Sequence, residues 1–245
     1  IVNVSDPTDP QIVGEYTNNT GYQQPAPSIL GIVIIDELVY LCKSYEGFLI
    51  LDISEKTEPL LLGKYNTDAQ VREINILGEY AYVAAGHSGL IIFDISNPNS
   101  PQLVSSYANE DYALSITLRD GYAYVSDRYT GLVTLDVTNP MDIQPVSVYN
   151  TGTIIFRMTF EEDYAYIANT DYGLLILDVS DPADPSFVGD YNTSGSSYDV
   201  AVQGDYAYIA VHSDGLVIVD VSDPTAPEWV SSYDTENSAM RIKII

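Results

Sequence analysis

The sequence repeats itself at a fixed spacing of 42 residues. Segments of one shared pattern begin at Glu37, Glu79, Gly121, Asp163 and Asp205, each 42 residues after the one before. A period between about 20 and 50 residues is typical of solenoids, propellers and repeat arrays. This repeat therefore constrains the fold more strongly than any other feature of the chain.

Each repeat has the pattern of four short strands. In the repeat at residues 163–204, apolar residues alternate with polar ones, and we expect strands one to four at 163–168, 174–179, 187–192 and 198–202. Gly and Pro interrupt the chain every few residues, and helical spacing of apolar residues over ten or more positions is missing. Four antiparallel strands in about 40 residues form one blade of a β-propeller.

Strand two carries the most regular motif of the repeat. A glycine precedes it, at Gly47, Gly89, Gly131, Gly173 and Gly215. An aspartate recurs within it, at Asp52, Asp94, Asp136, Asp178 and Asp220. We interpret this aspartate as part of a turn held by side-chain hydrogen bonds, because a carboxylate repeated in every blade serves every blade alike. Calcium at these acidic turns is the one cofactor kept as an alternative, although no Asp-x-Asp-x-Asp-Gly loop is present.

The strand-two segments also carry a family resemblance. They read GLLILDVSDP, GLVIVDVSDP, GLIIFDISNP, GLVTLDVTNP and GFLILDISEK. These segments resemble the LVIVD repeat of bacterial and archaeal surface proteins, over nearly the whole chain. Three positions depart from the pattern: Asn3 replaces the strand-two aspartate, and Lys56 and Ile143 each replace a turn proline. The resemblance implies a β-propeller exposed at the cell surface, with strand four innermost by analogy to related propellers.

Both ends of the sequence fit parts of the same pattern. Residues 1–7 align with 218–224 inside strand two, and residues 240–245 align with strand four. We therefore expect an all-β, six-bladed propeller of four-stranded antiparallel blades, whose closing blade is built from both termini and lacks one strand. Unpaired backbone beside that vacancy favours either further chain outside this sequence or a strand donated by a neighbour. Residues 1–245 are expected to form a single propeller domain of a longer protein.

Composition excludes some partners. Acidic residues outnumber basic ones by 35 to 9, for a net charge of −26, which repels nucleic-acid phosphates and anionic lipid headgroups. We expect no nucleic-acid partner because of this charge. We also expect no direct membrane insertion, since no apolar run approaches the roughly 18 residues of a membrane span.

Cys42 is expected to be a small buried apolar residue. Glycosylation sequons at Asn18 and Asn192 fit the extracellular location that the family resemblance implies.

Tyrosines separate into two groups. Fifteen of the 21 recur in strands one and three and are expected to pack between blades. The others lie at what we call the loop edge, where the loops joining strand one to two and strand three to four emerge. The candidate binding residues at this edge are Tyr22, Tyr45, His87, Tyr112, Arg128, Tyr129, Asp171, Tyr172, Tyr198 and His212. A rigid ring with a hydroxyl suits glycans and protein surfaces, whereas the alternative is that these side chains cover neighbouring blades.

The start of strand four varies in charge between repeats. If strand four lines the propeller channel, charged side chains meet at its mouth: Glu73, Arg157, Asp199, Arg241 and Lys243. Such a mixed ring either grips a polar ligand or neutralises itself.

The sequence favours a binding protein over an enzyme. His87 and His212 lie three repeats apart, which a six-bladed ring places on opposite sides, and neither Gly-x-Ser-x-Gly nor His-Glu-x-x-His occurs. Our leading hypothesis is a non-enzymatic module that binds a protein or glycan through its loop edge. One alternative is a structural tile of a surface layer or filament, self-assembling through the open strand position. Another is a hydrolase or lyase using central carboxylates such as Glu73 and Asp199.

Overall fold

The computed structural model describes residues 1–6, 8–16, 28–108 and 111–244. These residues form 22 β-strands, and none of them lies in a helix. Accordingly, the described residues include no helix that could cross a membrane. The chain divides into two compact units, Ile1–Ser106 and Tyr107–Ile245.

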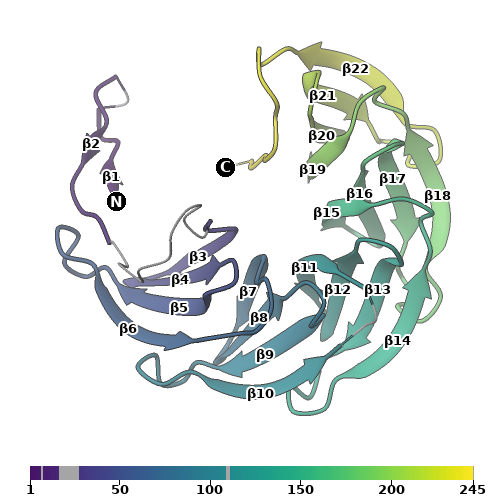
Figure 1. Cartoon of the computed structure of the whole chain (residues 1–245). Helices are drawn as coiled ribbons and strands as arrows, with labels where there is room; N and C mark the ends of the chain where they lie inside the picture. Colours follow the sequence, from purple (N-terminus) through teal and green to yellow (C-terminus); the bar gives the residue numbers. More distant parts are fainter. Residues whose placement is uncertain (7, 17–27, 109–110, 245) are drawn as a thin grey trace. The chain divides into compact units, whose positions relative to one another are not determined.

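The second unit contains three four-stranded antiparallel sheets (Figure 1). The first sheet consists of β11 (Ala113–Arg119), β12 (Tyr122–Asp127), β13 (Gly131–Asp136) and β14 (Gln144–Tyr149). The second consists of β15 (Ile155–Glu161), β16 (Tyr164–Asn169), β17 (Gly173–Asp178) and β18 (Ser186–Tyr191). The third consists of β19 (Ser197–Gln203), β20 (Tyr206–Val211), β21 (Gly215–Asp220) and β22 (Glu228–Tyr233).

The first unit contains two more four-stranded sheets and one strand pair (Figure 1). The strand pair is formed by β1 (Val2–Asn3) and β2 (Gln11–Ile12). The next sheet consists of β3 (Gly31–Ile35), β4 (Leu38–Lys43), β5 (Gly47–Asp52) and β6 (Leu60–Tyr65). The last consists of β7 (Glu73–Leu77), β8 (Tyr80–Ala84), β9 (Leu90–Asp94) and β10 (Gln102–Tyr107), whose final residue begins the second unit.

Every four-stranded sheet combines two repeats. Its first strand is strand four of one repeat, and the other three are strands one to three of the next, as in β15–β18. Adjacent strand-four elements pack on one another in the second unit, where β15 contacts both β11 and β19 (Figure 1). The predicted all-β fold of four-stranded antiparallel blades is therefore confirmed.

The predicted inner strand at 240–245 is the exception. Residues 234–244 form no strand, and residue 245 lies outside the described part of the chain. Strand four normally pairs with the strand one that follows it in sequence, as β19 pairs with β20. For residues 240–244, no following strand one is present among the described residues. This segment therefore does not pair as a strand.

The core lies between neighbouring sheets. On β17, Leu174 and Ile176 pack in a cluster with β20 and β21, whereas Leu175 and Leu177 pack in a cluster with Tyr124. Successive strand residues point to opposite faces, so this strand is buried on both sides. The uninterrupted apolar run of strand two follows from this position in the middle of a stack of sheets.

The aspartate of strand two holds the turn that follows it. Asp136 Oδ1 accepts hydrogen bonds from Thr138 Oγ1 at 2.6 Å and from Thr138 N at 2.9 Å. The bond from the Thr138 hydroxyl has the larger effect and the bond from the Thr138 N–H the smaller. Together they hold the pKa of Asp136 below its usual value. An equivalent hydrogen bond, donated by the backbone N–H two residues further on, is accepted by Asp52, Asp94, Asp178 and Asp220. The predicted turns held by side-chain hydrogen bonds are thus confirmed.

Candidate functional site

Three loop tyrosines of the predicted set project from the protein. Tyr45 is 68% exposed, Tyr129 63% and Tyr172 53%. Tyr172 precedes Gly173, which has a φ of +90° and whose Cβ, if present, would lie 2.3 Å from the Tyr191 carbonyl oxygen. Only glycine fits there without displacing backbone. The close approach of Gly173 to Tyr191 therefore fixes the backbone conformation of the hairpin that carries Tyr172. Tyr22 lies outside the described residues.

The hairpin between β12 and β13 presents a charged residue beside an aromatic one. Its buried Asp127 accepts a hydrogen bond from Tyr129 N at 3.1 Å, and Arg128 N donates to the Tyr112 carbonyl oxygen at 3.0 Å. The Arg128 guanidinium carbon lies 5.5 Å from the centroid of the Tyr129 ring, within range of a cation–π contact. Three of the predicted residues, Tyr112, Arg128 and Tyr129, therefore meet at this hairpin.

A row of rings follows the start of β19. Tyr198 stacks on Phe156, with 4.6 Å between ring centroids and 16° between planes, and the His212 ring lies 5.6 Å from Tyr198. Ser238 Oγ lies 3.1 Å from His212 Nε2. The structure brings the predicted Tyr198 and His212 together but adds Phe156, which occupies the template position of Tyr198 one repeat earlier.

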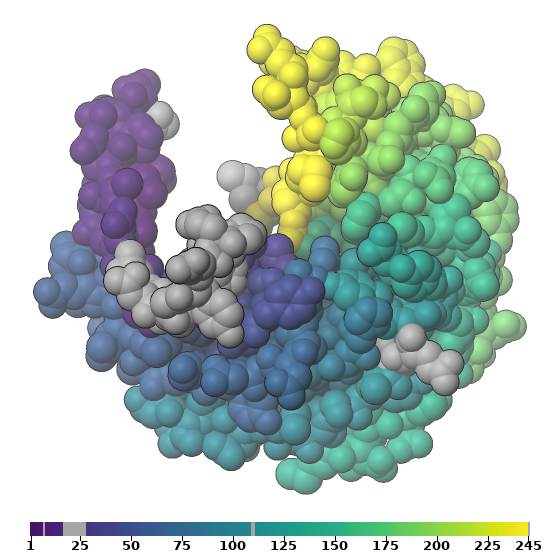
Figure 2. Space-filling model, viewed as in Figure 1, coloured from purple at the N-terminus to yellow at the C-terminus, as the bar shows by residue number. Residues whose placement is uncertain are grey.

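Asp199 holds the C-terminal segment. It is buried, with 8% of its surface exposed, and accepts hydrogen bonds from Val200 N at 2.9 Å and Ile242 N at 3.2 Å. Burial raises the pKa of Asp199, and the bond from Ile242 and the charges of Arg157 and Arg241 oppose that rise. Figure 2 shows the yellow C-terminal segment running beside the green strands of this sheet. Asp199 and the two arginines therefore neutralise one another in part.

The other predicted residues join none of these clusters. Asp171 is exposed on the same hairpin as Tyr172, and Lys243 is exposed in the C-terminal segment. His87 is exposed and Glu73 is half-buried on β7, both within the first unit, where Tyr45 also lies.

A pocket of about 210 Å³ lies at the loop edge of the second unit, between the sheets β11–β14 and β15–β18. It is lined by Tyr149, Asn150, Thr151, Asn169, Tyr172, Leu175, Phe187 and Asp190. Of these eight lining residues, only Tyr172 was predicted as a binding residue from the sequence. Tyr149 was expected to pack, because a tyrosine recurs at its place in strand three of every repeat. The signal for Phe187 was the variation of its position, since Pro145 and Trp229 replace it in the neighbouring repeats.

Hydrogen bonds tie the two loops around this pocket together. Thr153 Oγ1 donates to Asn169 Oδ1 at 2.6 Å, and Thr151 Oγ1 donates to the Thr153 carbonyl oxygen at 2.7 Å. Thr170 donates from both its N–H and its hydroxyl to the Ile154 carbonyl oxygen, each at 3.0 Å. The connection from β14 to β15 is therefore joined to the hairpin that bears Tyr172.

The expectation that every strand tyrosine packs between sheets is partly wrong. Tyr82 and Tyr124 are buried as expected, but Tyr206 is 40% exposed and Tyr233 70% exposed. Both exceptions belong to the sheet β19–β22. No further sheet among residues 111–244 covers its outer face.

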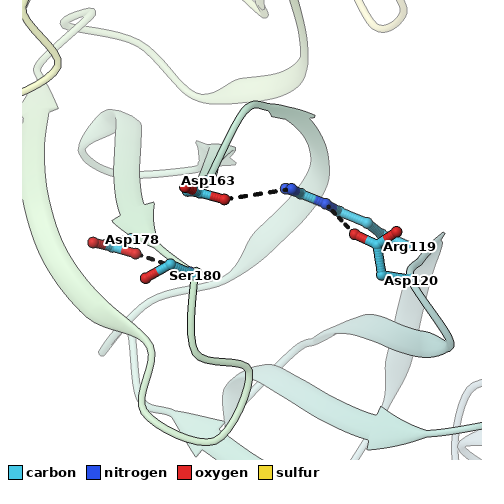
Figure 3. A network of polar contacts seen from close by, with 5 residues as sticks. All are labelled: Arg119, Asp120, Asp163, Asp178 and Ser180. Atoms are coloured by element: carbon cyan, nitrogen blue, oxygen red, sulfur yellow. Dashed lines mark hydrogen bonds and ion pairs between the residues drawn. The ribbon is translucent and has the colours of Figure 1, made fainter.

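A second charged cluster lies at the opposite edge of the sheets (Figure 3). Arg119 Nε lies 3.1 Å from Asp120 Oδ2, and Arg119 Nη2 lies 3.8 Å from Asp163 Oδ1. The guanidinium carbon also lies 5.5 Å from the centroid of the Phe160 ring. Arg119 thus joins two neighbouring sheets far from the loop tyrosines, a structural role.

No arrangement of three or more His, Cys, Asp or Glu side chains suited to a metal ion occurs in the described ranges. The acidic turns carry hydrogen bonds between their own side chains and backbone instead, as for Asp136.

The first unit has an apolar groove of about 470 Å³. Its walls include Ile1 and Val2 on one side and the face of β3–β5 on the other, where Ile32 and Ile34 are each 59% exposed. The remaining lining residues are Tyr16, Ile29, Val39, Leu41, Lys43, Leu49, Leu51, Ile53 and Pro59.

Solved structures with a similar fold share little sequence with this chain. A functionally unknown protein from Desulfotomaculum acetoxidans gives a TM-score of 0.70 at 13% identity, over 86% of this chain and 72% of that one. The β-propeller domain of Cps50 (Swd1) from Myceliophthora thermophila gives 0.68 at 11% identity, over 86% and 74%. The computationally designed Ika8 protein gives 0.68 at 9% identity, over 86% of this chain and 63% of its own. These likenesses show a β-propeller fold and nothing of function.

The family comparison covers most of the sequence. No curated protein matches the chain. The model of the LVIVD repeat matches six segments, at residues 1–18, 31–67, 69–109, 111–151, 158–193 and 194–235. The protein therefore belongs to the LVIVD-repeat family, as a β-propeller built from six of these repeats.

Proposed function

We propose that the protein is a non-enzymatic binding module of the cell surface that holds a protein or glycan partner on its loop edge. The outward presentation of Tyr129 and Tyr172 on hydrogen-bonded hairpins carries this proposal. Tyrosine loses little conformational entropy on binding and combines an apolar ring with a hydroxyl. Exposed aromatic side chains on fixed loops are typical of recognition surfaces.

The charge distribution supports this choice of partner. The net charge of −26 disfavours polyanions, and Arg128 beside Tyr129 supplies a local positive charge within the acidic surface. A location outside the cell rests on the resemblance of the strand-two segments to repeats of surface proteins.

The environment of the central carboxylate supports a non-enzymatic role. Asp199 accepts two backbone hydrogen bonds, and the charges of Arg157 and Arg241 act on it. A general acid or base must be free to exchange a proton with a substrate. Asp199 is instead committed to the C-terminal segment.

The test is an array of glycans and surface proteins probed with the wild-type chain. The double variant Tyr129→Ala/Tyr172→Ala should lose at least tenfold in affinity for the partner found, about 1.4 kcal/mol. Met141→Ala is the matched control, because Met141 is 70% exposed on the turn after β13, at the opposite edge of its sheet. Equal loss in both variants, or no binding to any array member, would contradict the proposal.

The apolar groove of the first unit supports a second candidate, self-assembly as a structural tile. Ile32 and Ile34 expose apolar surface on β3, which favours association. Light scattering of the wild type should then show oligomers that Ile32→Thr/Ile34→Thr converts to monomers. A monomeric wild type at all concentrations would eliminate this candidate.

A further inference from the structure

The pocket at the loop edge of the second unit has aromatic walls. Tyr149 lies at the end of β14 on one sheet, and Phe187 lies on β18 of the next, with Tyr172 on the hairpin at the rim. Phe187 is 55% exposed and Tyr172 53% exposed. Their ring surfaces are thus open to a ligand, and the C–H faces of a sugar ring pack favourably on aromatic rings.

The lining also offers unused hydrogen-bonding groups. Asn169 is 2% exposed, and its Oδ1 accepts the hydroxyl of Thr153, while its Nδ2 donates to no other described residue. Asn150 likewise uses Oδ1, which accepts from Gly152 N at 2.8 Å. Asp190 adds a carboxylate, which only accepts. A ligand hydroxyl both donates and accepts, so it can satisfy amide donors and the carboxylate together.

The charge of the lining selects among sugars. Asp190 is its only charged residue, and it is negative. An anionic ligand, such as a uronic acid or a sugar phosphate, would meet this carboxylate without a compensating cation. The pocket volume of about 210 Å³ also lies below the roughly 300–1,000 Å³ of a drug-sized site, which indicates one ring rather than a chain.

The neighbouring repeat lacks this combination. The template positions of Asn169 and Tyr172 are occupied there by Val211 and Asp214. Trp229 replaces Phe187, so an aromatic residue alone does not define the site. The combination of the buried Asn169 amide with the exposed Tyr172 ring is therefore missing from that next repeat.

We propose that this pocket binds the ring of one uncharged sugar unit, stacked against Phe187 and Tyr172 and hydrogen-bonded by Asn169. The inference rests on the proposed function, because it names the ligand class for the same loop edge. The bound ring is a terminal or branching residue of a glycan whose remainder extends outward past Tyr172.

The test is a titration of the ¹⁵N-labelled full chain with the methyl glycosides of glucose, galactose, mannose and N-acetylglucosamine, followed by amide chemical shifts. At least one glycoside should shift the amides around Asn169 and Tyr172, with a dissociation constant on the order of millimolar. Glucuronate, the anionic probe, should bind at least tenfold more weakly. A failure of all four glycosides to shift these amides at tens of millimolar would overturn the inference, as would equal binding of glucuronate.

Variants locate the ligand. Asn169→Val and Phe187→Ala should each weaken the glycoside at least tenfold; valine stands at the equivalent position of the next repeat, and Phe187 is exposed, so both chains keep the fold. Trp229→Ala, at the Phe187 position of that next repeat, should leave binding unchanged. Unchanged affinity in Asn169→Val and Phe187→Ala would refute the site.

The two proposals fail in different ways. Array binding that depends on Tyr129 and Tyr172, without any glycoside shift at the pocket, would leave the binding module standing and remove the sugar site. A glycoside shift at the pocket without any array partner would support the sugar site and contradict the larger binding role.

Discussion

Ser147 Oγ donates a hydrogen bond to the carbonyl oxygen of Pro182 at 2.6 Å, which joins strand three of one repeat to the turn of the next. Glycine occupies the equivalent position in two other repeats. A Cβ at Gly63 would lie 2.2 Å from the Pro98 carbonyl oxygen, and one at Gly189 would lie 2.3 Å from that of Pro224. The position therefore accepts only a residue that leaves the carbonyl room or donates a hydrogen bond to it.

Replacing Gly189 by alanine should destabilise the protein. The new methyl group would be forced against the Pro224 carbonyl oxygen without offering it a hydrogen bond, at a cost of about 1–3 kcal/mol. Gly189→Ser should cost less, because its hydroxyl can donate as that of Ser147 does. Urea unfolding followed by fluorescence measures both changes. Equal stability of the alanine and serine variants would show that the carbonyl needs no donor.

Replacing Thr134 by valine should stabilise the protein. Thr134 lies fully buried on β13, and its hydroxyl has no hydrogen-bond partner among the described residues. The equivalent residues of the other full repeats are isoleucines, at Ile50, Ile92, Ile176 and Ile218. Valine keeps the shape and removes the unpaired polar group, so the free energy of unfolding should rise by about 1–3 kcal/mol.

The control for Thr134 is a threonine whose hydroxyl is used. Thr170 Oγ1 donates to the Ile154 carbonyl oxygen at 3.0 Å, so Thr170→Val should destabilise where Thr134→Val stabilises. Thermal unfolding of the two variants gives the comparison. A lower melting temperature for Thr134→Val would show that its hydroxyl has a partner.

Stability should fall in acid because of the turn aspartates. The side-chain hydroxyl and then the backbone N–H of Ser96 donate to Asp94, and those of Ser222 donate to Asp220. These hydrogen bonds lower the pKa of both aspartates below the usual value of an aspartate. A group whose pKa is lower in the folded state stabilises the fold above its unfolded pKa, and this contribution is lost as the pH falls through the folded pKa. Urea midpoints should therefore decrease from about pH 5 downward.

Asparagine at these positions tests the origin of that loss. Asn3 takes the aspartate's place in the first repeat and still accepts a hydrogen bond from Ser5 N at 3.0 Å. Asp94→Asn/Asp220→Asn should therefore keep both turns and show a shallower loss of stability between pH 5 and pH 2. An unchanged acid slope would assign the loss to other carboxylates.

The sheets could be predicted from the repeat because every strand recurs at a fixed offset. The turn at Asp136 could be predicted because it needs only two residues close in sequence, Asp136 and Thr138. The pocket around Asn169 could not be predicted in the same way. It combines Tyr149 from one sheet with Phe187 from the next, and their roles depend on how two repeats stack. The exposure of Tyr233 likewise depends on which sheet lacks a neighbour within its unit.

Asp199 should control the order of the C-terminal segment. Its carboxylate accepts the Ile242 N–H, and 238–244 form no strand hydrogen bonds. Asp199→Ala should raise amide hydrogen exchange at 240–244 by at least tenfold while leaving β20 and β21 protected. Asp199→Asn retains an acceptor oxygen and should show a smaller increase. Unchanged exchange in the alanine variant would mean that other contacts hold the segment.

Cys42 should report the opening of the first unit. It is fully buried in the cluster of Phe48 and Val71, and burial raises its pKa to about 12. At pH 8 such a thiol is ionised in roughly one molecule in ten thousand, and only the thiolate reacts. Iodoacetamide should therefore label the native chain only through openings of this core, at a rate that rises with urea, whereas the fully unfolded chain should react like free cysteine. Rapid labelling without urea would contradict this burial.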